Sequence, residues 1–242
     1  MTDIKLEVEK RVQFIKDALA QAGARGIVFG NSGGKDSALV GILCKMACDD
    51  TLAVMMPCFS KRNFGEDLED ADALAKQFAI ETITVDLTGT RAALLAAIEP
   101  FGGVSDSAVI NIAPRLRMTT LYAIAQTRGA LVAGTGNADE AFMGYFTKWG
   151  DGAYDLNPIA DLHVSEIYAM LRYLNAPQSI IGKAPSAGLY DGQTDEGDMG
   201  VCYAAVERYM KGEPVTDGER AVIERMHGRS EHKRRPSLRY GG

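Results

Sequence analysis

The chain has 242 residues, a formal net charge of −6 at neutral pH and a hydrophobic fraction of 46%. This length suits one large α/β domain or two small ones, and the apolar content excludes disorder as the default state. The acidic balance argues against a general nucleic-acid binder. Because no apolar run approaches the roughly 18 residues of a membrane-spanning helix, we expect no membrane partner. The first residues lack an apolar signal segment, so a cytoplasmic protein is expected.

Apolar spacing predicts alternating helices and strands along the first half of the chain. Helices are expected over residues 3–22, 37–48, 66–79, 90–98 and 111–128, and strands over 26–30, 51–57, 83–85 and 130–135. Residues 99–110 contain one proline and two glycines, which predicts a surface loop. The alternation predicts an α/β fold with a doubly wound, mostly parallel sheet flanked by helices.

The sequence pattern changes after residue 147, where glycines and prolines separate short predicted helices. No repeat and no clean linker is present, so we treat residues 1–242 as a single domain with a helical C-terminal part. Residues 231–236 form a small basic cluster, and composition alone favours a solvated tail there.

Residues 30–37 read Gly-Asn-Ser-Gly-Gly-Lys-Asp-Ser and lie between a predicted strand and a predicted helix. Glycines let the backbone approach a phosphate, and the N–H groups of a helix start favour an anion. Ser32 and Ser37 add hydroxyl donors, while Asp36 adds a hard oxygen ligand for Mg²⁺. A polyphosphate with its metal satisfies all of these groups at once.

This loop differs from the Walker loop, in which the lysine directly precedes Ser or Thr. It resembles instead the SGGxDS loop of the N-type ATP pyrophosphatases. That resemblance implies cleavage of ATP between the α- and β-phosphates and activation of a substrate as an adenylate. The alternative, a chance glycine–serine string in a turn, is disfavoured by the flanking strand and helix.

Further strings resemble, in this order, the ammonia-dependent NAD synthetases. They cover residues 114–118, 134–137, 145–152, 183–189, 193–196 and 232–234. The resemblance runs from about residue 5 to residue 236 and implies a ligase that forms a carbon–nitrogen bond. In the implied reaction the nicotinate carboxylate of deamido-NAD attacks the α-phosphorus of ATP, giving NAD-adenylate and pyrophosphate. Ammonia then attacks the activated carbonyl and releases NAD and AMP.

The resemblance also implies roles for individual residues. Asp36 and Glu140 match Mg²⁺ ligands, and Asp151 matches a residue that positions ammonia or takes a proton from it. The implied ATP-binding residues are Gly30, Asn31, Ser32, Gly33, Gly34, Lys35, Asp36, Ser37, Thr135 and Ser186. The implied deamido-NAD-binding residues are Arg115, Lys148, Asp155, His232 and Lys233. Without the resemblance, the charged residues at 115 and 148 would be interpreted as surface charges, and the aspartate at 151 as a turn residue.

Two positions depart from the family pattern. Position 35 is usually uncharged in this branch and is lysine here, while Val164 stands where the family has an ATP-contacting lysine. Either Lys35 replaces the missing cation, or Val164 joins an apolar helical stripe and Lys35 is solvated. The sequence leaves both interpretations open.

Two other enzyme classes of the same superfamily remain as alternatives. The first is a diverged adenylating amidotransferase that acts on another carboxylate. The second is a tRNA-thiolating enzyme, which would favour a basic surface and reactive cysteines that this acidic chain does not offer. For the leading hypothesis we expect a homodimer, with deamido-NAD, ATP and ammonia as ligands. A separate glutaminase that supplies the ammonia is left open.

Overall fold

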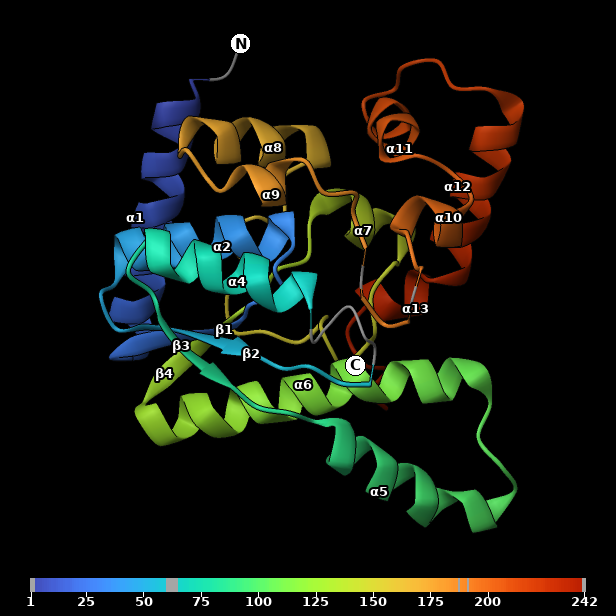
Figure 1. Cartoon of the computed structure of the whole chain (residues 1–242). Helices are drawn as coiled ribbons and strands as arrows, with labels where there is room; N and C mark the ends of the chain where they lie inside the picture. The colour runs from blue at the N-terminus through green and yellow to red at the C-terminus, as the bar shows by residue number, and fades with distance from the viewer. Residues whose placement is uncertain (1–2, 60–64, 187, 191, 241–242) are drawn as a thin grey trace.

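The computed structural model describes residues 3–59, 65–186, 188–190 and 192–240. Its centre is a sheet of four parallel strands in the order β3-β2-β1-β4 (Figure 1). The strands are β1 (Gly26–Gly30), β2 (Thr51–Met55), β3 (Glu81–Thr84) and β4 (Ala130–Ala133). Val28 in β1 pairs with Leu52 on one side and with Val132 on the other. The predicted parallel α/β fold is therefore confirmed.

Helices cover both faces of this sheet (Figure 1). One face carries α1 (Ile4–Ala22), α2 (Lys35–Ala47), α4 (Glu66–Gln77) and α8 (Val164–Tyr173), and the other carries α6 (Asp106–Arg128). Alternate strand residues point to opposite faces. Ile27 and Phe29 accordingly join one core cluster with the first group of helices, whereas Val28 joins a second cluster with residues of α6. The sheet is buried on both sides, as parallel sheets usually are.

The remaining elements lie around this core. They are α5 (Thr88–Ile98), η1 (Glu99–Phe101), α7 (Ala138–Met143), α9 (Gln178–Ile181), α10 (Asp195–Met199), α11 (Tyr203–Met210), α12 (Asp217–Arg229) and α13 (Glu231–Arg234). The helices from α10 onward gather around α7 (Figure 1). They share a third apolar cluster that contains Met143, Tyr203 and Ile223. Within the described residues, no helix combines the length and apolar character needed to cross a bilayer.

The predicted surface loop over 99–110 is wrong in its second half. Helix α6 already begins at Asp106, because the Ser105 hydroxyl caps it by accepting a hydrogen bond from the Ala108 N–H at 3.4 Å. The helix then continues through Pro114, which is buried. Tertiary packing therefore overrides both the loop composition and the cost of an internal proline.

The turn between β1 and α2 requires glycine at position 33. Gly33 has a φ of 73°, and a Cβ added there would lie 2.3 Å from the backbone oxygen of Asp67. At the next position, Gly34 has a φ of −92°, and an added Cβ would meet only the Ser32 hydroxyl, at 3.3 Å. A side chain is therefore excluded at position 33 but can be accommodated at position 34.

We predict that Gly33→Ala lowers the free energy of unfolding by about 2 kcal/mol or more, because it adds left-handed strain and a backbone clash. Gly34→Ala is the matched control and should cost less than about 1 kcal/mol. Urea denaturation of both variants measures the difference. Equal losses would show that the backbone at position 33 can relax and that its geometry is not required.

Candidate active site

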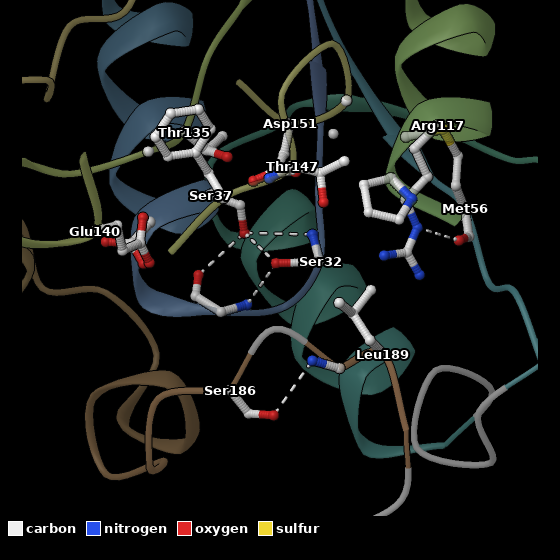
Figure 2. A pocket seen from close by; sticks show the side chains of 18 of the residues that line it. Ser32, Ser37, Met56, Arg117, Thr135, Glu140, Thr147, Asp151, Ser186 and Leu189 are labelled. Atoms are coloured by element: carbon white, nitrogen blue, oxygen red, sulfur yellow. Dashed lines mark hydrogen bonds between the residues drawn. The ribbon is translucent and has the colours of Figure 1, made fainter. Parts of the chain in front are cut away.

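The carboxyl ends of β1, β2 and β4 open into one cavity of about 580 Å³. Open parallel sheets bind ligands at this edge, because the loops after several strands meet there. Figure 2 shows Glu140 on one side of the cavity and Arg117 on the other, with Ser32 and Ser37 between them. The lining also includes residues from the segments 144–151 and 183–195, far along the chain. The fold therefore collects the predicted loop and the C-terminal motifs around one space.

The loop after β1 is organised by its own side chains. The Ser37 hydroxyl accepts a hydrogen bond from the Ser32 N–H at 3.3 Å and donates one to the Gly34 carbonyl at 3.0 Å. Ser37 is buried, whereas Ser32 is exposed in the cavity. At Gly34, the N-cap of α2, no described side chain caps the free N–H groups. These N–H groups and Ser32 are therefore the donors that the loop offers to an anion.

Asp36 and Glu140 are joined through the buried side chain of Asn137. The Asn137 amide donates to Asp36 Oδ1 at 3.2 Å, and its carbonyl oxygen accepts from the Glu140 N–H at 3.0 Å. The Glu140 carboxylate in turn accepts from the Asn137 N–H at 3.1 Å, which completes a capping box at the start of α7. Burial and the nearby charge of Asp36 raise the pKa of Glu140. A shared cation would relieve this repulsion.

Lys35 is buried beneath these carboxylates, and only 5% of its surface is exposed. Its ammonium donates to Asp36 Oδ2 at 2.7 Å and lies 5.2 Å from the centre of the Tyr203 ring. Burial alone would lower the pKa of Lys35, but the charges of Asp36, Glu140 and Asp195 outweigh burial and raise it. The interpretation of Lys35 as a solvated side chain is therefore wrong. Val164 is buried in the same apolar cluster as Tyr203.

Asp151 also lines the cavity, in the turn that follows Thr147. Its carboxylate accepts a hydrogen bond from the Thr147 N–H at 3.0 Å. Asp151 is accessible from the cavity, but desolvation by the surrounding protein raises the pKa of its carboxyl. The backbone hydrogen bond and the charges of Lys233 and Arg117 oppose that rise. A carboxylate with a raised pKa is suited to taking a proton from a reacting amine.

Most of the predicted ATP, metal and catalytic residues line the cavity. They are Gly30, Asn31, Ser32, Gly34, Lys35, Asp36, Ser37, Thr135, Glu140, Asp151 and Ser186. Gly33 does not, because it turns toward the backbone of Asp67. Of the predicted deamido-NAD residues, Lys233 lines the cavity. The other four, Arg115, Lys148, Asp155 and His232, are described and lie outside its lining within a single chain.

Three of those four residues make contacts elsewhere. Arg115 is exposed and donates to the Lys148 carbonyl at 3.3 Å. Lys148 donates to the carbonyl of His232 at 2.6 Å, and Asp155 accepts from the Val132 N–H at 2.8 Å. The side chains of these three residues therefore form hydrogen bonds with backbone groups of the same chain. Any role in holding deamido-NAD stays a prediction.

The structure presents Arg117, rather than Arg115, to the cavity. Its Nε donates to the Met56 carbonyl at 3.1 Å, and Figure 2 shows the guanidinium directed into the space. The spacing along α6 explains this placement, because Ile110, Pro114 and Leu121 lie three to seven residues from Arg117 on the same side of the helix and also line the cavity. Arg115 itself is outside the lining, although Asn111 and Met118, one turn away on either side, belong to it.

Lys183 is another cavity residue; it belongs to one of the strings that carry the family resemblance, but no individual role was predicted for it. Its ammonium donates to Asp67 and Asp70 at 2.7 Å each, which ties the loop before α10 to the start of α4. Both carboxylates are largely buried. The ion pairs fix one wall of the cavity.

The basic segment at 231–236 is not merely a solvated tail. Lys233 donates to the carbonyls of Gly144 and Phe146 at 2.8 and 2.7 Å. Arg234 donates to the Phe142 carbonyl at 3.1 Å, at the C-terminal end of α7. Cations suit the carbonyl end of a helix. The segment therefore supports the turn that carries Thr147 and Asp151.

Comparison with known proteins gives a consistent result. A family model described as NAD synthase matches residues 7–237. The NH(3)-dependent NAD(+) synthetase of Carboxydothermus hydrogenoformans is 43% identical over 239 residues, which cover 95% of this chain and 94% of the relative. This chain belongs to the NAD synthase family. The members of this family are ligases that form a carbon–nitrogen bond.

Two solved structures differ in how closely this NAD synthase family member matches them. The NMN synthetase from Francisella tularensis has a TM-score of 0.95, with 37% identity and complete coverage of both chains. The NH3-dependent NAD synthetase from Campylobacter jejuni, in complex with the nitrate ion, has a TM-score of 0.78, with 29% identity and coverage of 99% of this chain and 100% of the other. The overall fold is shared with both.

The residues present fit the Mg²⁺ that the family implies. Among the described residues, no group of three or more His, Cys, Asp or Glu side chains is arranged as a metal cage. Asp36 and Glu140 instead offer two carboxylates linked by Asn137 beside the phosphate loop. Mg²⁺ is commonly held by one or two carboxylates together with phosphate and water.

We predict that Arg117→Gln raises the KM for the nicotinate nucleotide roughly 10- to 100-fold, since it removes a charge-assisted contact from the cavity. Arg115→Gln is the matched control, because Arg115 is two residues away and outside the cavity lining, and it should change KM less than about threefold. Steady-state kinetics measure both, with melting temperatures to verify folding. If Arg115→Gln has the larger effect, the substrate contacts the other face of α6.

Proposed function

We propose that this chain catalyses the ATP-dependent amidation of a nicotinate nucleotide by ammonia, with deamido-NAD as the first candidate substrate. The observation that carries this proposal is the joining of the phosphate loop, a carboxylate pair and Asp151 in one cavity. Adenylation needs the phosphates at one end and the reacting carboxylate near the middle. Amidation then needs a proton acceptor beyond it, and Asp151 has the raised pKa for that role.

The residues of this chain divide the work as follows. The N–H groups at the start of α2 and the Ser32 hydroxyl bind phosphate oxygens. Asp36 and Glu140 would hold Mg²⁺, which would supply positive charge beside the phosphate oxygens. The nicotinate carboxylate attacks the α-phosphorus, forms the adenylate and releases pyrophosphate. Ammonia then attacks the carbonyl carbon, Asp151 takes a proton, and AMP leaves.

Nicotinate mononucleotide is the second candidate substrate. The specific observation in its favour is the TM-score of 0.95 with an NMN synthetase of fully matching extent, against 0.78 for an NAD synthetase. The cavity agrees with this candidate, because it presents Arg117 and Lys233, whereas Arg115, Lys148 and His232 lie outside it. A mononucleotide has one phosphate to bind and no adenosine half.

One experiment tests both candidates. Purified protein is given ATP, Mg²⁺ and ammonium with either deamido-NAD or nicotinate mononucleotide, and AMP and the amide product are quantified by chromatography. A higher kcat/KM for deamido-NAD supports the first candidate, and a value at least about tenfold higher for the mononucleotide supports the second. Amide formation from neither would refute the proposed reaction, and thiolation of bulk tRNA in a parallel assay would favour the superfamily alternative.

We also propose a homodimer, supported by the hairpin of α5, η1 and the start of α6. None of the residues of α5, all within the described ranges, is buried, although its sequence is rich in alanine and leucine. Leu94 is 39% exposed and Phe101 is 88% exposed. Helix α1, by contrast, buries Val8, Ile15 and Leu19 in the core. A second copy of the chain is the occupant that we expect on the hairpin.

We predict that Leu94→Asp combined with Phe101→Asp weakens dimerisation roughly tenfold or more, since charges would enter an apolar contact. Light scattering and sedimentation at micromolar concentration measure the change. Leu6→Asp is the control, because Leu6 is 47% exposed on α1 and distant in sequence from the hairpin. A fully active wild-type monomer, or equal dissociation in the control, would contradict the proposed interface.

A further inference from the structure

The loop after β1 contains a positive charge of its own, which is buried and paired with one of the two carboxylates. Lys35 is the first residue of α2, and its ammonium donates to Asp36 Oδ2 at 2.7 Å. Its side chain is 5% exposed and that of Asp36 is 17% exposed. An ion pair so poorly hydrated is expensive to break, because each partner would be left as a buried charge.

The surroundings hold the ammonium of Lys35 in this place. It lies 5.2 Å from the centre of the Tyr203 ring, and the Tyr203 hydroxyl donates to Asp195 Oδ2 at 2.8 Å. Both Tyr203 and Asp195 are buried. The cation is therefore enclosed by an aromatic face and carboxylates, and a swing toward the open cavity would forfeit all of these contacts.

The opposite oxygen of Asp36 is also engaged. Asp36 Oδ1 accepts from the Asn137 amide at 3.2 Å, and Asn137 forms the capping box with Glu140. Lys35 and Asn137 thus each donate a hydrogen bond to one oxygen of the Asp36 carboxylate, and together they set its orientation. A metal ion on the oxygen that binds Lys35 would lie within about 5 Å of the ammonium, from the 2.7 Å hydrogen bond and a Mg²⁺–oxygen distance of about 2.1 Å.

We propose that Lys35 is a positioning residue, a resident counter-cation that orients Asp36 and keeps the carboxylate pair from binding a divalent ion until nucleotide phosphates arrive. In the absence of nucleotide, the ammonium offsets the carboxylate charge and repels a second cation across a poorly hydrated distance. The phosphates of ATP add several negative charges, which offset the repulsion between the Lys35 ammonium and the divalent ion. Both cations can then lie beside the carboxylates. Metal and nucleotide binding are therefore coupled, and each strengthens the other by the same factor.

This inference rests on the proposed function for the identity of the metal and the nucleotide, but it can be tested without turnover. Mn²⁺ serves as the probe, and its binding is measured by electron paramagnetic resonance or calorimetry with and without a non-hydrolysable ATP analogue. Lys35→Met removes the charge at similar length, and Lys35→Arg retains it. Lys45→Met is the matched control, because Lys45 pairs with Asp49 near the other end of α2.

Lys35→Met should bind Mn²⁺ at least tenfold more tightly than the wild type without nucleotide, and its coupling to the ATP analogue should shrink by a similar factor. Its melting temperature without metal should fall, and Mg²⁺ should raise it more than in the wild type. Lys35→Arg and Lys45→Met should bind Mn²⁺ as the wild type does. If Lys35→Met proves too unstable, Lys35→Gln provides the same comparison.

Unchanged or weaker Mn²⁺ binding in Lys35→Met would overturn the proposal. So would the loss of ATP-analogue affinity in the presence of a chelator with Mn²⁺ binding unchanged, because that pattern shows direct contact between Lys35 and phosphate. Either result leaves the proposed amidation intact, since neither measurement depends on turnover. Failure of the amidation assay would in turn leave the Mn²⁺ result valid.

Discussion

The side chain of Asn137 is the contact on which the active-site end of this fold depends. It is completely buried, and both its donor and its acceptor are used, toward Asp36 and toward the Glu140 N–H. A buried amide that loses one of these partners pays the full cost of desolvation. The loop after β1 and the helix after β4 are therefore held in one relative position. The two carboxylates face the same space because of this bridge.

A second constraint comes from the end of the chain. Lys233 and Arg234 donate to carbonyl groups at the C-terminal end of α7 and in the turn that follows it. Asn137 caps the other end of the same short helix. A helix of six residues has little stability of its own. Its position, and with it that of the Thr147 and Asp151 turn, depends on these contacts at both ends.

The sequence predicted the parallel sheet and the turn between β1 and α2 well, because alternating apolar runs and a glycine-rich turn are local patterns. It did not predict the surroundings of Lys35, since Tyr203 lies 168 positions further along the chain. The hydrogen bonds of Lys233 go to backbone carbonyls, which no residue type reveals. The family resemblance drew attention to Arg115, whereas the structure places Arg117 in the cavity lining.

The cavity is electrically asymmetric, and this asymmetry orders its two ligands. Asp36, Glu140 and Lys35 lie at one end, where carboxylates suit a metal and its phosphates. Arg117 lies on the opposite side from Glu140 (Figure 2), and Arg117 and Lys233 both act electrostatically on Asp151, so cations there suit a carboxylate or a single phosphate. The first group of residues suits a nucleotide with its metal, and the second suits a nicotinate nucleotide. Their reactive groups, the α-phosphorus and the carboxylate, would meet between them, which is the geometry that adenylation requires.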